Sequence, residues 1–358
     1  MPRDHYLFSN GRLCRRQNTL WFEKADEARM PEDAHEDTGA PSGDLIGEKA
    51  VIPVEAVDAL HLFGEVDINS KLIVFLAQNR IPVHVYGYYG SYAATLYPRE
   101  YLLSGRLTVA QAEHYLRPKK RLTLAQAFVE ASLFNIRRTL LYFEKRVAGA
   151  ALVRAALGVV EREAERVPTE PAIPELMAAE GRARDAYYRA WPGLLGPALA
   201  EAFPFDGRSR RPPQNALNAA ISFGNALCYA TCLKALYRTA LDPTVSYLHE
   251  PGDRRYSLAL DLSEVFKPLL VDRAIFRLLK TGHLQPRHFE PHLGGVYLTD
   301  AGRRRFVEAW DERLRRTVLH RGLGRHVSYE RLVRLDAHRL VRHLTDPADP
   351  YRGFHAWW

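Results

Sequence analysis

The sequence predicts an α+β protein, with a small N-terminal β domain over residues 1–99 followed by a larger, all-helical domain over residues 106–358. Short strand-like runs fill the first hundred residues, the composition shifts near residues 99–105, and long amphipathic helical patterns dominate beyond that point. The length of 358 residues is enough for two domains, and the 47% of apolar residues is ordinary for a globular protein.

Strand signals follow one another through the first domain. Tyr6–Phe8 and Leu13–Cys14 flank Ser9-Asn10-Gly11, which predicts a hairpin because Asn-Gly tolerates the left-handed conformations of a tight turn. An apolar helix is predicted after Asn69-Ser70. That helix covers 71–78, and the remaining strands are predicted over 19–22, 50–54 and 81–86.

The second domain shows mainly helical spacing. Apolar residues such as Leu124, Phe128 and Leu140 recur at helical intervals between Thr123 and Leu141. Helices are predicted over 108–116, 121–146, 174–191 and 215–239, then a short strand over 294–298 and a basic helix from Thr299.

Charge is unevenly distributed along the chain. Asp26–Glu48 holds eight acids and one base, with Pro and Gly and almost no aromatic residues, so we expect a solvated, mobile loop. The net charge of +8 becomes +15 when this stretch is set aside. Only nine of the 50 basic residues are lysines, and the planar fork of arginine suits phosphate, which indicates nucleic acid. The alternative is codon bias in a GC-rich genome.

Several other classes of protein are excluded. The longest apolar candidate, near Ala226–Tyr237, is interrupted by Lys234 and is too short to span a membrane. The N-terminus lacks the apolar core of a signal peptide. Cys14, Cys228 and Cys232 form neither a disulfide framework nor a zinc pattern. We therefore expect a soluble, cytoplasmic protein without a membrane partner.

The first stretch that could carry chemistry is Ala179–Tyr188. On a helix, Glu180, Arg184 and Tyr187 or Tyr188 share one face. Gly181 costs about 1 kcal/mol of helix stability relative to alanine, which indicates either a packing reason or the close approach of something large. The alternative is a surface ion pair between Glu180 and Arg184.

A second stretch combines one imidazole with two carboxylates. His249 precedes a Pro-Gly turn, and the following helix carries Asp261 and Glu264 three residues apart, on one surface. Such a set suits Mg²⁺ or Mn²⁺, and the histidine favours Mn²⁺. In the alternative, Asp261 caps the helix, Glu264 supports its first turn, and His249 is a hydrogen-bonded core residue.

Two basic stretches complete the candidates. Arg208, Arg210 and Arg211 stand on a loop before a helix N-terminus, where free backbone N–H groups favour phosphate. Residues 301–358 hold thirteen arginines and seven acids. Both stretches are also compatible with solvated basic surfaces.

Taken together, these motifs resemble the CRISPR-associated integrase of spacer acquisition, the family often called CRISPR-associated protein one. The match spans Tyr6–Trp358, and Asn18-Thr19-Leu20 and Tyr88-Tyr89-Gly90 are similar to the branch that accompanies type I systems. The motifs that carry the resemblance are, in order, Phe63–Ser70, Glu180–Tyr188, Pro212–Gly224 and Leu248–Glu264.

The resemblance implies a β domain that forms a homodimer and a helical catalytic domain with a site for Mg²⁺ or Mn²⁺. Glu180, His249 and Glu264 are the implied metal ligands and catalytic residues, with Asp261 as an accessory acid. The implied partners are double-stranded DNA (protospacer and CRISPR repeat) and a small adaptation protein, CRISPR-associated protein two. The candidates for holding the DNA backbone are Arg182, Arg184, Arg208, Arg210 and Arg211.

The implied reaction is attack of a DNA 3′-hydroxyl on a phosphodiester of the CRISPR repeat, with water as the alternative nucleophile in nuclease activity. Because one phosphodiester replaces another, the reaction requires no ATP, which agrees with the missing phosphate-binding loop. Two other functions remain open at this point. One is a metal-dependent repair nuclease that cuts branched DNA, and the other is a non-catalytic DNA-binding protein.

Overall fold

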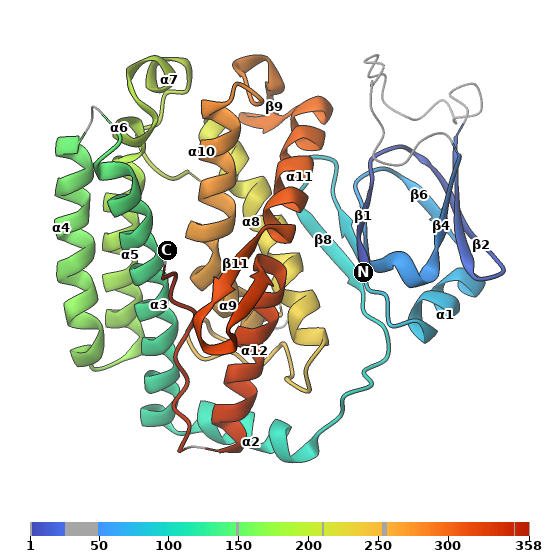
Figure 1. Ribbon diagram of the computed structural model, residues 1–358, viewed down its shortest axis with the longest axis horizontal. Coiled ribbons are helices and arrows are strands. Elements are labelled where there is room, and N and C mark those ends of the chain that lie inside the picture. The colour runs from blue at the N-terminus through green and yellow to red at the C-terminus, as the bar shows by residue number, and fades with distance from the viewer. Residues whose placement is uncertain are drawn as a thin grey trace. The chain divides into compact units, whose positions relative to one another are not determined.

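The structure is a computed structural model that describes residues 2–25, 49–147, 150–209, 211–252, 256–346 and 348–357. The chain divides into two units (Figure 1). The β unit comprises Met1–Tyr101 together with Thr299–Val307, and the helical unit comprises Leu102–Leu298 and Glu308–Trp358. The first part of the helix predicted from Thr299 therefore groups with the β unit, and the rest of that helix groups with the helical unit. The predicted acidic loop over 26–48 lies outside the described residues.

The β unit contains two four-stranded sheets. Its elements are β1 (Arg3–Leu7), β2 (Gly11–Arg16), β3 (Thr19–Lys24), β4 (Lys49–Pro53), β5 (Val57–Leu62), β6 (Val66–Ile68), α1 (Ser70–Gln78), β7 (Val83–Tyr86) and β8 (Tyr92–Leu96). One sheet has the order β1-β5-β7-β8. In it, β1, β5 and β7 are parallel to one another, and β8 pairs with β7 in the antiparallel direction. The other has the order β4-β3-β2-β6.

Both sheets contribute to one apolar core. Leu13 and Phe22 from the second sheet and Leu60 from the first belong to a single buried cluster, together with side chains of α1. The Asn69 side chain accepts a hydrogen bond from the Leu72 N–H at 3.0 Å and so caps α1. The helix predicted after Asn69-Ser70 is thereby confirmed.

The hairpin predicted at Asn10-Gly11 is wrong, because β1 and β2 belong to different sheets. The Asn10 side chain instead accepts a hydrogen bond from the Glu65 N–H at 2.8 Å, and the Gly11 N–H donates to the Glu65 carbonyl at 2.9 Å. A Cβ on Gly11 would lie 2.3 Å from the Glu23 carbonyl oxygen. The glycine therefore allows a close approach between strands where the chain passes from one sheet to the other.

The helical unit is mostly rather than entirely helical, because two two-stranded ribbons interrupt it. Its first helices are α2 (Gly105–Leu116), α3 (Pro118–Glu144), α4 (Ala150–Arg166), α5 (Ile173–Arg189), α6 (Trp191–Leu195), α7 (Pro197–Ala202) and α8 (Ala216–Tyr237). They are followed by α9 (Ser257–Lys267), a π-helical segment (Pro268–Asp272), α10 (Arg273–Lys280), β9 (Phe289–His292), β10 (Gly295–Leu298), α11 (Asp300–Arg315), β11 (Thr317–His320), β12 (Arg325–Ser328) and α12 (Tyr329–Thr345). The predicted α+β class is confirmed.

Helix α8 is the central core helix of this unit. The expectation that this apolar stretch is too short to span a membrane is wrong, because the helix begins at Ala216 and is long and apolar enough by length and composition. However, 72% of the relevant window is buried within the protein. Residues on every side of it, such as Leu217, Leu227 and Leu233, are fully buried. A helix that is apolar all round is expected at the centre of a bundle, and this burial explains the composition of α8.

The C-terminal segment after α12 returns along α3 (Figure 1). On α3, the fully buried Asn135 donates to the Val265 carbonyl at 2.9 Å and to the Phe354 carbonyl at 2.8 Å. It also accepts from the Ala356 N–H at 2.9 Å. One amide therefore holds the C-terminal segment and α9 against α3.

We expect Asn135→Ala to lower the free energy of unfolding by about 2–4 kcal/mol, because it removes three buried hydrogen bonds to backbone groups. Urea unfolding followed by circular dichroism measures this change. Gln126→Ala on the same helix is the control, since its bonds are long, at 3.3 and 3.4 Å, and partly exposed. Equal losses for the two variants would contradict the assignment of Asn135 as a clamp.

Candidate active site

His249 is aimed by the buried carboxylate of Asp261. The imidazole Nδ1 lies 2.8 Å from Asp261 Oδ1, and Asp261 is fully buried at the centre of α9. The backbone N–H groups of residues 247, 248 and 249 also donate to the two Asp261 oxygens, at 2.7, 3.0 and 3.0 Å. A carboxylate accepts hydrogen bonds, so Nδ1 carries the proton and Nε2 presents the lone pair.

Glu180 and Glu264 are brought together by one guanidinium. Arg184 lies one helical turn after Glu180 on α5, and its Nε is 2.5 Å from Glu180 Oε1. Its Nη2 is 2.7 Å from Glu264 Oε2 on α9. The two carboxylates, 84 residues apart in the sequence, thus converge on a single buried cation.

A second cation completes the charge balance around Glu264. Lys267 Nζ lies 2.5 Å from Glu264 Oε1, one helical turn along α9. Burial would raise the pKa of Glu264, but the charges of Arg184 and Lys267 hold it well below its usual range. Burial would lower the pKa of His249, yet its hydrogen bond to Asp261 and the charges of Asp261 and Glu264 raise it. Glu264 is therefore ionised, and it lies close enough to His249 to affect its pKa.

The arginines expected to hold DNA have different surroundings. Arg184 is only 8% exposed and donates to Ser132 Oγ besides its two carboxylates, so its guanidinium organises the site rather than facing a DNA strand. Arg182 makes a bidentate pair with Glu163 at 2.8 and 3.0 Å. Arg208 donates to Asn218 Oδ1 at 2.8 Å. Arg211 is exposed, and Arg210 lies outside the described residues.

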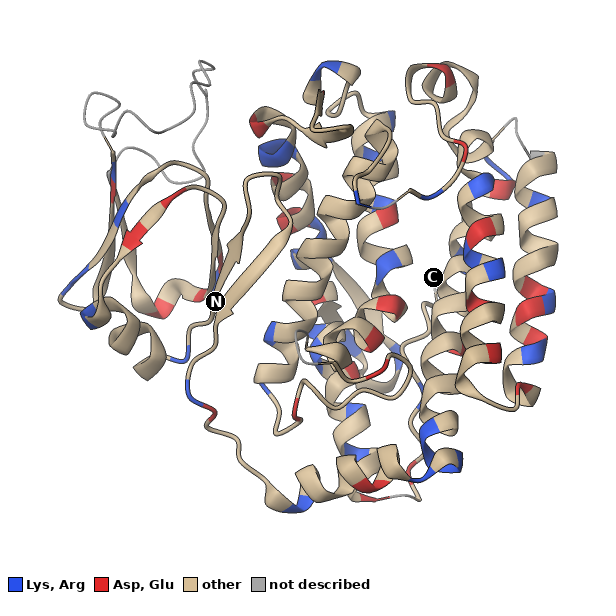
Figure 2. Ribbon diagram, turned by 180° about the vertical axis from the view of Figure 1, so that it is seen from behind, with Lys and Arg blue, Asp and Glu red and all other residues tan. Residues whose placement is uncertain are grey.

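Much of the basic excess is neutralised locally. Acidic and basic residues alternate along α4 and α5, at the right of the view in Figure 2. Glu163, for example, also lies 3.8 Å from Arg166 on the same helix. Net charge therefore overstates how many guanidinium groups of these helices are available for a polyanion.

Gly181 has no packing partner among the described residues. It is exposed, and a Cβ built on it would meet no described atom within 4 Å apart from its chain neighbours and the nearby backbone of its own helix. Close packing against a neighbouring element therefore does not explain why a glycine occupies this helical position in the described structure. What is left is an open helix surface directly after Glu180, accessible to a bulky ligand.

A further buried layer supports the site and was missed by the sequence analysis. Tyr187 on α5 donates to Asp272 Oδ2 at 3.0 Å, and both side chains are buried. Burial raises the pKa of Asp272 to about 7. Asp272 ends a π-helical turn, a conformation that often occurs beside functional sites. Helical spacing from Glu264 could have found Lys267, whereas no local signal indicated Asp272.

The donor types of Glu180, His249 and Glu264 suit a divalent metal ion. Two carboxylate oxygens and one imidazole nitrogen are typical ligands of Mn²⁺ and acceptable ligands of Mg²⁺. The hydrogen bond from Nδ1 to Asp261 is the usual support of a metal-binding histidine. The two glutamates already share a cation, Arg184, which shows that their arrangement favours positive charge between them.

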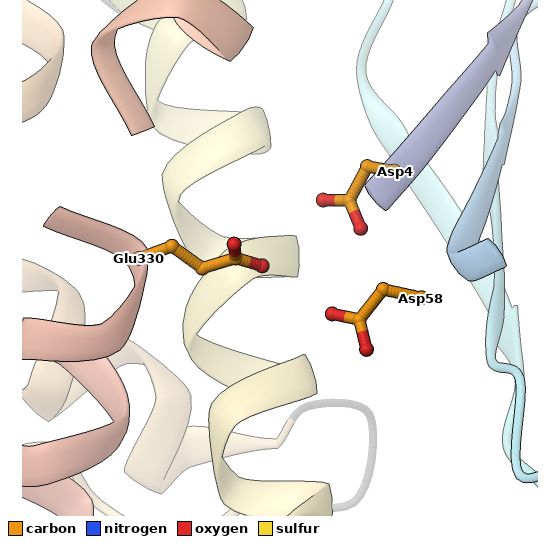
Figure 3. A group of neighbouring side chains, drawn as sticks. All are labelled: Asp4, Asp58 and Glu330. Carbon is orange, nitrogen blue, oxygen red and sulfur yellow. The ribbon is translucent and has the colours of Figure 1, made fainter. Parts of the chain in front are cut away.

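Three other carboxylates, drawn in Figure 3, do not belong to this site. Asp4 on β1 and Asp58 on β5 are part of the β unit, whereas Glu330 on α12 is part of the helical unit. Within its own unit, Asp4 lies 3.4 Å from His61, and Glu330 pairs with Lys234. None of the three is among the candidate residues Glu180, His249, Asp261 and Glu264.

Comparison with known proteins gives the same class of enzyme as the site. A family model described as "CRISPR associated protein Cas1" matches residues 5–312. A CRISPR-associated endonuclease Cas1 of Moorella thermoacetica is 45% identical over 99% of this chain and all of the relative. One of Pyrococcus horikoshii is 39% identical over 98% of both. The solved structure of a CAS1 protein from Thermotoga maritima has a TM-score of 0.79 and 37% identity, covering 96% of this chain and 97% of that one.

A helical unit that carries an oriented histidine and two carboxylates paired through one arginine is typical of metal-dependent enzymes of phosphodiester chemistry. The chain belongs to the CRISPR-associated protein Cas1 family. The resemblance found in the sequence is thereby confirmed, and with it the predicted class of enzyme, a DNA endonuclease and integrase of CRISPR spacer acquisition. A casposase bound to an integration product shares the fold at a TM-score of 0.77 and 20% identity.

Proposed function

We propose that the protein inserts short DNA segments into a CRISPR array through a site in which Glu180, His249 and Glu264 hold one divalent ion. The observation that carries this proposal is the convergence of Glu180 and Glu264 on Arg184, beside an imidazole that Asp261 aims. These residues come from α5, α9 and the segment before the Pro251-Gly252 turn, three segments that are distant in the sequence.

In the proposed reaction, the oxygen of a DNA 3′-hydroxyl forms a bond to a phosphorus atom of the repeat, and the bond from that phosphorus to a deoxyribose 3′-oxygen breaks. A bound divalent ion would lower the pKa of the attacking hydroxyl and offset charge on the phosphate. His249 supplies Nε2 as a ligand or accepts the hydroxyl proton, and Asp261 keeps the ring in place for either role.

Arg184 and Lys267 support the carboxylates of the proposed metal site. Their charges keep Glu264 ionised, and they stabilise the two carboxylates while no metal is bound. Asp261 acts as a positioning residue, since both of its oxygens are already used by donors of residues 247–249. Asp261 therefore supports the ligands rather than acting as a fourth one.

We infer Mn²⁺ as the ion of highest affinity and Mg²⁺ as a working alternative. Imidazole nitrogen is a better ligand for Mn²⁺ than for Mg²⁺, which strongly prefers oxygen. The carboxylates of Glu180 and Glu264 suit both ions.

We further propose double-stranded DNA as the substrate, a homodimer formed through the β unit, and a small adaptation protein as partner. The solved complex named Cas6-RT-Cas1–Cas2 shares the fold at 19% identity, and its name supports the partner by analogy. Arg182, Arg208 and Arg211 stay candidates for the DNA backbone, as does Arg210. Cytoplasmic location and accompaniment by a type I system complete the proposal.

One experiment separates the proposal from its two alternatives. A short duplex with free 3′-hydroxyls is incubated with the protein, its small partner, Mn²⁺ and a supercoiled plasmid that carries a CRISPR repeat. We expect covalent joining of the duplex at the repeat. Cleavage of branched DNA without any joining would favour a repair nuclease, and DNA binding without chemistry under Mn²⁺ or Mg²⁺ would favour a binding protein.

The raised pKa of His249 predicts how metal binding depends on pH. Protonated imidazole cannot ligate, so Mn²⁺ affinity should fall as the pH drops through a midpoint above the ordinary value of 6.5. The sign reverses for stability without metal, where the protonated ring stabilises the fold at low pH and this contribution is lost as pH rises through the folded pKa.

Isothermal titration with Mn²⁺ from about pH 5.5 to about pH 8.5 measures this dependence. His249→Ala is the matched variant and should bind Mn²⁺ more weakly at every pH, with a flatter profile. An unchanged profile in His249→Ala would contradict the assignment of His249 as a ligand.

A further inference from the structure

A basic pocket lies between α12 and the C-terminal segment of the helical unit, and the metal site uses none of its residues. Its volume is about 450 Å³, and Arg339, Arg342, Arg352, His355 and Trp357 are among the residues that line it. The segment that forms one wall is well anchored. A Cβ on Gly353 would lie 2.6 Å from Ala131 Cβ, so the segment packs directly on α3.

The guanidinium groups of this pocket are only partly neutralised. Arg339 lies 3.5 Å from Asp336, which is fully buried and also accepts a hydrogen bond from Tyr351. Arg342 lies 3.6 Å from Asp349, and its side chain is 65% exposed. Arg352 is exposed and makes no ion pair with any residue of the described ranges. Three guanidiniums thus face one pocket whose only acidic lining residue among those described is Asp349.

Two rings also line the pocket, those of His355 and Trp357, and the pKa of His355 reflects the positive charge around it. Burial lowers the pKa of His355, and the charges of Arg339 and Arg352 lower it further, against the opposing effect of Glu130. The half-buried indole of Trp357 forms an aromatic wall, fixed by its Nε1 donating to the Leu319 carbonyl at 2.9 Å. A flat apolar surface beside arginine forks is suited to a nucleotide unit.

We propose that this pocket binds a phosphodiester of the DNA substrate through Arg342 and Arg352, with Arg339 beneath them and Trp357 at its edge. It is a second DNA contact of the helical unit, distinct from the metal site. The inference rests on the proposed function in one respect, which is that DNA is the substrate.

A strand of DNA fits this pocket better than a small metabolite does. Sites for small molecules are mostly apolar and bury most of the ligand surface. Here the two outer guanidiniums are exposed at the rim, where a continuous backbone can pass across them. Arginine forks that bind one phosphate while the strand continues into solvent are typical of backbone contacts.

The test measures DNA binding in EDTA, so that it does not depend on the metal site. Fluorescence anisotropy with a labelled duplex over a salt series gives the Kd and its salt dependence for Arg342→Gln, Arg352→Gln and the double variant. We expect each single variant to raise the Kd about fivefold and to lower the slope of log K against log salt by about 0.9. Arg352→Lys, which retains the charge, should keep the wild-type slope.

Arg154→Gln is the matched control, an exposed arginine on α4 without an ion pair among the described residues. It should leave the slope unchanged, and an equal loss in this variant would reduce the effect to net charge and overturn the proposal. Wild-type slopes in both pocket variants would also overturn it. The proposal would also be overturned if the wild type bound inorganic phosphate or a nucleoside monophosphate tightly while the variants kept the wild-type DNA slopes. A third contrary result would be variants that lose only their binding to the small partner protein. Loss of joining activity in a metal-ligand variant, by contrast, concerns only the proposed function.

Discussion

Glu180→Gln should abolish strand transfer while leaving DNA binding in EDTA within about twofold of wild type. The substitution keeps the size of the side chain and a hydrogen-bond acceptor for Arg184 but removes the charge that a divalent ion requires. Metal stabilisation of the transition state contributes several kcal/mol, and each 1.36 kcal/mol is tenfold in rate, so we expect a loss of about 1,000-fold or more. The joining assay with the repeat-bearing plasmid measures it.

Glu163→Gln is the matched control for this variant. Glu163 also pairs with an arginine of α5, Arg182, but it lies on α4 outside the metal site. It should join DNA at close to the wild-type rate. If Glu180→Gln retained more than about a tenth of the wild-type rate, less than 1.4 kcal/mol would be involved, and the metal assignment of Glu180 would be wrong.

Asp261→Asn should have the second largest effect, because Asp261 organises His249 without touching the DNA. The carboxylate accepts four hydrogen bonds, whereas an asparagine has one acceptor oxygen and presents an N–H₂ group to donors. We expect Mn²⁺ affinity and the joining rate to fall by about 10- to 100-fold, as for other groups that support metal ligands.

Asp261→Asn should also lower the free energy of unfolding by about 1–3 kcal/mol, because at least one buried N–H loses its acceptor. Asp242→Asn is the control, because Asp242 also accepts from a backbone N–H, that of Thr244, but in an exposed position. High Mn²⁺ concentration should partly restore joining by Asp261→Asn and should not restore Glu180→Gln. Full activity of Asp261→Asn at low Mn²⁺ would show that His249 needs no such support.

The residues of the metal site could be predicted from sequence only as separate stretches. Helical spacing placed Glu180 with Arg184 and placed Glu264 after Asp261, but no local pattern relates α5 to α9. The family resemblance joined them, and the structure places both glutamates on Arg184. Their role as metal ligands stays a prediction that the variants above test.

Local patterns were misleading where tertiary contacts decide the outcome. Asn10-Gly11 has the composition of a hairpin turn, yet it connects two sheets, because pairing with β5 holds β1 in one sheet and pairing with β3 holds β2 in the other. Arg184 is of a residue type that commonly contacts DNA, yet its burial between two carboxylates gives it a structural role. Sequence distance says nothing about such contacts, since they form between segments far apart in the chain.

By itself, the sequence determined the α+β class, most of the long helices and the family, because periodicity and motif order are local properties. It also indicated a polyanionic partner through its arginine content. Only the tertiary structure decided which charges remain available, since a guanidinium is neutralised by whichever carboxylate the fold places within about 3 Å of it. That is why Arg182 and Arg184 are paired, while Arg352 at the C-terminal pocket is exposed to solvent.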